Sequence, residues 1–311
     1  MARIGNTSLD IFPLCLGGNV FGWTCDEKES FAVLDAYAEA GGNFVDTADV
    51  YAAWAPANSG GESETILGRW MAARGNRASI VVATKVGKLA GLTGLSARTI
   101  RAAAEGSLRR LGTDVIDLYY AHADDPATPL EETLGAFDAL VREGKVRAVA
   151  ASNYTAPRLT EALETSRRLG LARFEALQPH YNLVHRAEYE GGLAAVCARE
   201  GLSCFPYYAL ASGFLAGKYR PGAKVESARS GAASKRLDAR GLRVLAALDA
   251  VAAERRTTVA AVALAWLLAA GPAVTAPIAS ARTPEQLAEL LPAASLHLSD
   301  DEVRLLSEAS A

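Results

Sequence analysis

The sequence predicts a closed (β/α)8 barrel, and three observations predict it. Short β-branched or aromatic runs alternate eight times with longer stretches of helical period along the 311 residues. No Pro- or Ser-rich linker divides the chain, and its length is near that of a typical barrel. Polar residues recur where the buried runs end, as expected at the C-terminal mouth of a barrel. We therefore expect one domain over residues 1–311, with an open doubly wound sheet as the alternative.

The eight expected strands follow one another with a helix after each. They lie in FPLCLGG, NFVDTAD, SIVVATKVG, DVIDLYYAH, VRAVAASN, FEALQPHYN, LSCFPYYALASG and AVTAPIAS. Gly75, Gly112 and Gly170 are placed to end helices, and Ser96 and Thr155 are placed to begin them. RIGNTSLDI predicts an N-terminal β-hairpin before the barrel. Extra C-terminal helices are expected after the seventh strand and in SDDEVRLLSEAS.

One long segment, from Lys218 to Gly241, interrupts this alternation. It is basic and rich in small residues, and it precedes two of the expected helices. A solvated surface loop and a mobile lid over a ligand explain the segment equally well.

The composition argues against several classes of function. Half of the residues are hydrophobic and the net charge is −3, so neither nucleic acid nor an anionic membrane is expected as a partner. Four scattered cysteines without a CxxC motif, and no signal-peptide pattern, indicate a cytoplasmic protein. The apolar run at 259–271 is shorter than the ~20 residues of a spanning helix. We expect no metal site, because His180 and His185 have no partnering cysteine. We expect a monomer, because no strongly apolar face stands out as an oligomer interface.

Almost every expected strand delivers a polar side chain to the same end of the barrel. In chain order these residues are Asp46, Lys85, His122, Ser152, Asn153, Gln178, Tyr207, Tyr208, Ser280 and Arg282. Each has an ordinary structural alternative, such as a helix cap, a lysine that extends to solvent or a satisfied core histidine. Taken together they indicate a site, because chance would not place all of them at one mouth.

Three of these positions, together with Tyr51 in the loop after the second strand, predict a specific chemistry. A buried Lys85 needs a counter-charge, which Asp46 can supply. A lysine cation beside Tyr51 favours tyrosinate, so we expect a lowered phenol pKa and proton exchange near neutral pH. His122 can donate a hydrogen bond to an oxygen that gains charge. The pattern predicts a proton-donating site suited to a small-molecule carbonyl substrate.

Several motifs resemble the aldo-keto reductase family, in particular its microbial and potassium-channel-β-like branches. FVDTADVY resembles the family's Asp–Tyr strand, VVATKVG its lysine strand and IDLYYAH its histidine strand. GKVRAVAASN, QPHYNLVHR and ASGFLAGKY resemble later segments, so the resemblance covers nearly the whole chain. It implies hydride transfer from a nicotinamide to an aldehyde or ketone, with Tyr51 giving the proton assisted by Lys85, Asp46 and His122.

The resemblance also implies a cofactor held extended across the barrel mouth. Gly18 and Asn19 would border it, and Ser152, Asn153 and Gln178 would bind the carboxamide. Tyr207 would stack on the nicotinamide, Lys218 and Arg220 would contact the pyrophosphate, and Ser280 and Arg282 would hold a 2′-phosphate, with Gln286 nearby. A guanidinium suits phosphate, which favours NADPH and leaves NADH as the second choice. Lys218 and Arg220 can equally be solvated charges.

The sequence allows more than one interpretation of the substrate pocket and of the chemistry. Trp23 and Trp54 are expected as pocket walls, or else as residues that pack surface loops. One rival makes Lys85 a Schiff-base nucleophile of an aldolase-type lyase. The other is a non-catalytic protein that binds nicotinamide and senses redox state.

Overall fold

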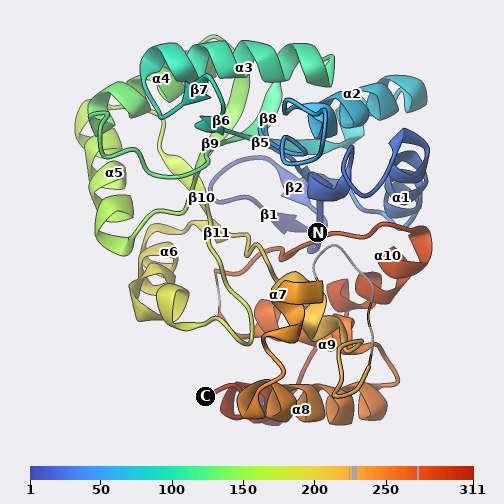
Figure 1. Cartoon of the computed structure of the whole chain (residues 1–311). Coiled ribbons are helices and arrows are strands. Elements are labelled where there is room, and N and C mark those ends of the chain that lie inside the picture. Colours follow the sequence, from blue (N-terminus) through green and yellow to red (C-terminus); the bar gives the residue numbers. More distant parts are fainter. Residues whose placement is uncertain (224, 226–229, 272) are drawn as a thin grey trace.

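Eight parallel strands form the central sheet of the computed structural model, which describes residues 1–223, 225, 230–271 and 273–311 (Figure 1). In spatial order the strands are β11 (Ser203–Cys204), β10 (Phe174–Gln178), β9 (Val146–Ser152), β8 (Ile116–Ala121), β5 (Val81–Val86), β4 (Phe44–Asp46), β3 (Cys15–Gly17) and β12 (Ile278–Ala279). The sheet closes where Cys204 pairs with Val274 and the Ile278 amide donates to the Pro206 carbonyl at 2.9 Å. The predicted (β/α)8 barrel is confirmed.

Helices surround the strands, as Figure 1 shows. They are α1 (Glu27–Glu39), α2 (Glu62–Arg74), α3 (Ala97–Leu111), α4 (Leu130–Arg142), α5 (Ala156–Leu169), α6 (Ala194–Glu200), α9 (Val259–Ala269) and α10 (Pro284–Leu290). The predicted caps are confirmed: Ser96 and Thr155 accept backbone N–H groups, and Gly75, Gly112 and Gly170 are left-handed. The extra helices are α8 (Ala239–Arg255) and α11 (Asp300–Ala309), joined by a 2.6 Å Arg255–Glu302 ion pair.

The predicted hairpin closes the N-terminal end of the barrel. It consists of β1 (Ala2–Arg3) and β2 (Asp10–Ile11), paired antiparallel. Ile4, Leu9 and Ile11 are buried in one cluster with barrel-interior residues such as Phe44 and Phe205. The interior is therefore blocked at this end, and a site can form only at the opposite mouth.

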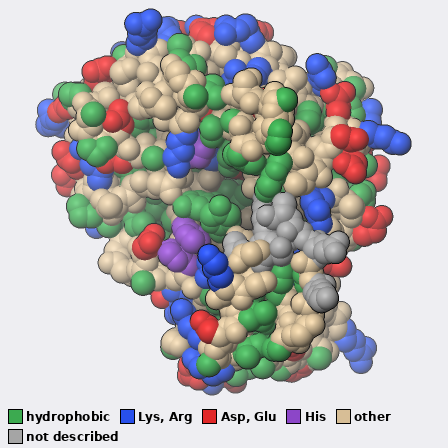
Figure 2. Space-filling view, in the orientation of Figure 1, with side chains coloured by type: hydrophobic (Ala, Val, Ile, Leu, Met, Phe, Trp, Pro, Cys, Tyr) green, Lys and Arg blue, Asp and Glu red, His purple; other side chains and the backbone are tan. Residues whose placement is uncertain are grey.

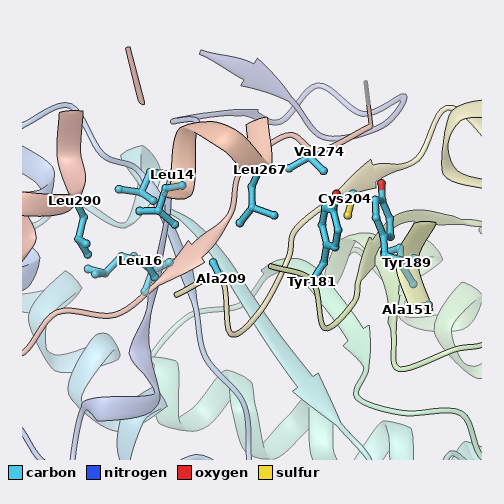
Figure 3. Close-up of a cluster of buried hydrophobic side chains, with 14 of the residues drawn as sticks. Leu14, Leu16, Ala151, Tyr181, Tyr189, Cys204, Ala209, Leu267, Val274 and Leu290 are labelled. Carbon is cyan, nitrogen blue, oxygen red and sulfur yellow. The ribbon is translucent and has the colours of Figure 1, made fainter. Parts of the chain in front are cut away.

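The seam where the barrel closes is filled by apolar side chains from distant parts of the chain. Figure 3 shows Leu14, directly before β3, and Leu16 of β3 near Leu267 of α9, with Val274 beyond them. Cys204 also belongs to this buried cluster. Because β11 and β12 are only two residues long, this packing supplements the few hydrogen bonds at the seam.

The last two barrel strands are shorter than predicted, because the chain leaves extended geometry early. Tyr208, Ala211 and Ser212 have positive φ, and residues 211–216 form the 3₁₀ segment η4. A second hairpin, β6 (Lys88–Leu89) with β7 (Leu92–Thr93), follows β5 and was not predicted.

The long segment from Lys218 to Gly241 contains more structure than predicted. It holds the short helix α7 (Ser230–Ser234), and Asp238 begins α8. Residues 224 and 226–229 lie outside the described part of the chain, so the choice between loop and lid stays open. Among the described residues, no helix is both long and apolar enough to cross a membrane.

Candidate active site

The predicted polar residues point into the barrel because of strand periodicity. Side chains two residues apart lie on the same face of a strand. Asp46, Lys85, His122, Ser152 and Gln178 each come two residues after a barrel-interior residue, namely Phe44, Ala83, Tyr120, Ala150 and Ala176. Since parallel strands end at the same side of the barrel, these side chains meet at one mouth.

Lys85 is fully buried, and its ammonium group has three acceptors. Its Nζ donates to Asp46 Oδ2 at 2.6 Å, to the Thr47 carbonyl at 2.8 Å and to the Tyr51 hydroxyl oxygen at 2.9 Å. An ammonium has three hydrogens, so each is used in the resting site. Burial lowers the pKa of Lys85, and the Asp46 carboxylate opposes that decrease.

Asp46 is held from both of its oxygens. Oδ1 accepts a hydrogen bond from Gln178 Nε2 at 2.8 Å, while Oδ2 accepts from Lys85 and, at 3.2 Å, from the Tyr51 hydroxyl. The Gln178 amide was expected to face a carboxamide, but in this structure its nitrogen binds Asp46. The Gln178 amide therefore helps to orient the Asp46 carboxylate.

The phenol of Tyr51 differs from the sequence expectation in one respect. Burial raises the pKa of Tyr51 well above its usual value, and the nearby Asp46 carboxylate adds to the increase. The expected decrease from Lys85 alone was wrong, because it ignored desolvation and the acid on the same oxygen. The phenol consequently carries its proton at neutral pH, which is the state a proton donor requires.

His122 lies beside Tyr51, with ring centroids 6.2 Å apart. Burial, and then the charges of Lys85 and Lys88, lower the pKa of His122 to about 2, so the ring is neutral. Its Nδ1 is buried without a hydrogen-bond partner among the described residues. A hydrogen on Nδ1 would be unsatisfied, which favours the tautomer with the hydrogen on Nε2.

A cavity of about 1010 Å³ opens above these residues. Figure 2 shows the mouth as a hollow near the centre of this face, with hydrophobic side chains and histidines around it. The predicted residues that line the cavity are Asn19, Trp23, Asp46, Tyr51, Trp54, His122, Ser152, Asn153, Gln178, Tyr207, Tyr208, Lys218, Ser280, Arg282 and Gln286. The structure thus brings distant sequence positions together in one cavity.

Gly18 does not line this cavity, and Gly17 does. A Cβ on Gly17 would lie 2.7 Å from Ser280 Oγ, so a side chain there would displace the serine. That serine hydroxyl donates to Asn19 Oδ1 at 2.7 Å. Gly18 instead is buried, and a Cβ there would lie 2.9 Å from Ser63 Oγ. Gly17 is therefore a lining residue that the sequence reasoning missed, and the expectation that Gly18 borders a cofactor stays a prediction.

Asn153, directly after β9, contacts Tyr207. It has φ of +56°, and its Nδ2 donates to the His122 carbonyl at 2.8 Å. Its Oδ1 accepts from the Tyr207 hydroxyl at 2.8 Å, and the His180 ring stacks on Tyr207 at 5.4 Å. Ser152 Oγ donates to the Gln178 carbonyl at 2.9 Å. The Tyr207 ring is therefore fixed at its hydroxyl and on its face.

Arg282 and Gln286, which were predicted at the phosphate end of a cofactor, line the cavity where the chain passes from β12 into α10. The Gln286 side chain accepts from the Arg282 backbone N–H at 3.0 Å and orients the start of α10. The Arg282 guanidinium has no hydrogen bond or ion pair with any described residue. Arg220 does not line the cavity and instead pairs with Asp249 at 2.6 Å. A phosphate role for Arg220 is therefore not supported.

Comparison with known proteins identifies the group to which this fold and site belong. A profile of the Aldo/keto reductase family matches residues 13–311. The chain belongs to this family. It is 35% identical to the uncharacterized oxidoreductase YrpG of Bacillus subtilis, over 98% of this chain and 94% of that one.

Two further relatives have more specific names. This aldo-keto reductase is 32% identical to norsolorinic acid reductase A of Aspergillus parasiticus, over 96% of this chain and 78% of the relative. It is 34% identical to a probable voltage-gated potassium channel subunit beta of Oryza sativa subsp. japonica, over 92% and 88%. The family membership predicted from the motifs is confirmed, and it makes the chain an oxidoreductase.

Several cavity residues of this aldo-keto reductase were missed by sequence reasoning. They are Gly17, Lys88, Leu210, Ser212, Gly213 and Gly217. Most come from the unpredicted β6–β7 hairpin or from the irregular backbone after β11. The glycines of ASGFLAGKY were a usable signal, because glycine allows the positive φ found at Gly213 and Gly217.

Asp49, close to this site, is a buried acid with no partner for either oxygen among the described residues. Burial, and then repulsion by Glu64, raises the pKa of Asp49 to about 7, although Arg110 and Lys85 oppose the change. Because the pKa of Asp49 is higher in the folded state, the unfolded chain releases this proton at a lower pH than the folded chain does. The stability that depends on Asp49 is complete below pH 4 and is lost as the pH rises through 7.

We expect Asp49→Asn to remove this pH dependence. The amide stays neutral, so the stability of the variant relative to wild type should rise by at most ~3 kcal/mol from pH 5 to pH 8. Thermal unfolding of both proteins at the two pH values measures the difference. An equal change in wild type and variant would show that Asp49 does not titrate in this range.

Proposed function

We propose that the protein reduces an aldehyde or ketone to an alcohol with NADPH, using Tyr51 as the proton donor. The observation that carries the proposal is the Tyr51–Lys85–Asp46 cluster at the cavity floor, with atoms 2.6–3.2 Å apart. A protonated phenol backed by an ammonium is suited to give its proton to an oxygen that gains charge.

The cavity residues suit a dinucleotide. A volume of about 1010 Å³ is at the upper end of the ~300–1,000 Å³ range of ligand sites. The lining includes Asp46 and Tyr51 of the cluster as well as Arg282, whose guanidinium has no ion-pair partner among the described residues. Arginine binds phosphate with two hydrogen bonds, which favours a 2′-phosphate and therefore NADPH. Asn19 and Ser280, joined by a hydrogen bond, also line the cavity.

Each residue of the cluster has a role in this chemistry. A bound reduced nicotinamide supplies the hydride. Tyr51 gives its proton to the substrate oxygen, and Lys85 stabilises the resulting phenolate by its 2.9 Å hydrogen bond. Asp46 fixes the ammonium, while the neutral His122 ring can donate from Nε2 to the same substrate oxygen. We expect the Tyr207 ring, whose hydroxyl is held by Asn153, to pack against the nicotinamide.

One alternative function is supported by a specific observation. The similarity to a potassium channel subunit beta favours a protein that binds nicotinamide and senses redox state with little turnover. The Schiff-base alternative lacks comparable support. Lys85 is buried and donates all three of its hydrogens, so it is not a free nucleophile.

The proposal is tested by following the oxidation of NADPH and NADH with a panel of aldehydes. We expect wild type to prefer NADPH, and Arg282→Ala to lose about 10- to 100-fold in NADPH affinity, since a charge-assisted hydrogen bond to phosphate is removed. NADH affinity should change little. Cofactor binding without turnover would favour the sensor, and equal losses for both cofactors would exclude the 2′-phosphate role of Arg282.

A further inference from the structure

An aromatic wall runs from the catalytic phenol to the rim of the cavity. The Trp54 ring contacts Tyr51 edge-on with centroids 5.9 Å apart, and Trp23 contacts Trp54 at 5.7 Å. Trp54 is 49% exposed, which is unusual for so large an apolar side chain. A flat ring would cover this exposed surface and bury apolar area on both partners.

Lys88 is a cation at the same side of the mouth. It belongs to β6, directly after the strand that carries Lys85, and it lines the cavity. No hydrogen bond or ion pair joins it to any residue in the described part of the chain. Lys88 is an exposed residue, and partial desolvation lowers its pKa, with repulsion by the Lys85 charge adding to the decrease. Its own charge acts on His122, so the ammonium is near the reacting end of the cavity.

The charges that line the cavity do not balance at this end. The lining cations are Lys88, Lys218 and Arg282, and the lining acids are Asp46 and Glu289. Asp46 is already paired with the buried Lys85. Lys218 follows β11 and Arg282 follows β12, whereas Lys88 follows β5, on the opposite side of the closed sheet. The cofactor phosphates proposed above therefore leave Lys88 without an anion.

We propose that Lys88 selects the substrate by binding a carboxylate on an aromatic aldehyde or ketone whose ring packs on Trp54 and Trp23. The inference rests on the proposed carbonyl reduction and names its substrate class. The carbonyl lies at Tyr51 and His122, the ring lies along the aromatic wall, and the carboxylate reaches the β6–β7 hairpin. A neutral aromatic aldehyde keeps the first two contacts and lacks the third.

The test compares acids with their uncharged esters. The substrates are 3- and 4-carboxybenzaldehyde and the matching methyl formylbenzoates, assayed with NADPH on wild type, Lys88→Met and Lys88→Arg. For at least one isomer we expect wild type to prefer the acid by about tenfold in kcat/KM, mainly through KM, because the contact is remote from the reacting atoms. Lys88→Met should lose the preference and keep its activity on the ester. Lys88→Arg should retain most of the preference.

Different failures have different meanings. Equal kcat/KM for acid and ester in wild type, or an unchanged preference in Lys88→Met, would overturn the role of Lys88 and leave carbonyl reduction intact. Lys88→Gln replaces the methionine variant if that one does not fold. If wild type reduces no aldehyde at all, the proposed function fails instead. Titration of tryptophan fluorescence with benzoate and methyl benzoate then tests the carboxylate preference separately, and equal binding would sink it.

Discussion

Tyr51→Phe should lower kcat for aldehyde reduction by about 10²- to 10⁴-fold, the usual contribution of a positioned general acid. The substitution removes only the hydroxyl group that Lys85 and Asp46 contact. The ring keeps its edge contacts with Trp54 and His122, so the cavity wall stays in place. Affinity for NADPH should therefore be unchanged. Steady-state kinetics and a fluorescence titration of the cofactor measure the two quantities.

Tyr207→Phe is the matched control for this result. It also removes a phenol hydroxyl from the cavity, but that hydroxyl donates to Asn153 and not into the Lys85 cluster. We expect this variant to lose cofactor affinity or orientation while keeping most of its kcat. If Tyr51→Phe instead reduces aldehydes at the wild-type rate, another group supplies the proton and the assignment of the acid is wrong.

Lys85→Met should lower the free energy of unfolding by about 3–5 kcal/mol, the usual cost of removing one partner of a buried ion pair. The Lys85 side chain is 0% exposed and that of Asp46 is 3% exposed, so water cannot replace the lost ammonium. The carboxylate would remain near the floor with only Gln178 and Tyr51 as donors. Chemical denaturation at neutral pH measures the change.

Two controls separate this effect from a general loss of packing. Asp46→Asn combined with Lys85→Met removes the unpaired charge, so it should recover part of the lost stability. Arg3→Met breaks the exposed Arg3–Asp10 pair, where both side chains are more than half exposed, and should cost less than ~1 kcal/mol. Similar losses for the buried and the exposed pair would contradict the desolvation argument.

The fold and the meeting of the site residues were predictable, because both depend on periodic patterns. Each barrel strand alternates inward and outward positions, so a polar residue two places after an apolar interior residue must reach the mouth. Asp46 after Phe44, and Gln178 after Ala176, follow this rule. The ends of the helices were equally predictable from the sequence, because Ser96 and Gly112 cap α3 through hydrogen bonds to residues a few positions away.

The sequence predictions differ from the structure where the outcome depends on contacts between distant residues or on irregular backbone. The pKa direction of Tyr51 depends on how completely the folded chain excludes water from the phenol, which no short motif records. Lys88 lies on a two-residue strand with no periodic signal. The distinction between Gly17 and Gly18 depends on the distance to Ser280, more than 260 residues later in the chain.

The hairpin over the N-terminal end of the barrel has a kinetic consequence. With Ile4, Leu9 and Ile11 packed into that end, nothing can reach or leave the phenol from below. The cofactor and the carbonyl substrate must therefore both enter through the open mouth of the barrel. The reactant that binds deeper must bind first and dissociate last. The order of binding and release is therefore set by a few apolar residues far from the reacting atoms.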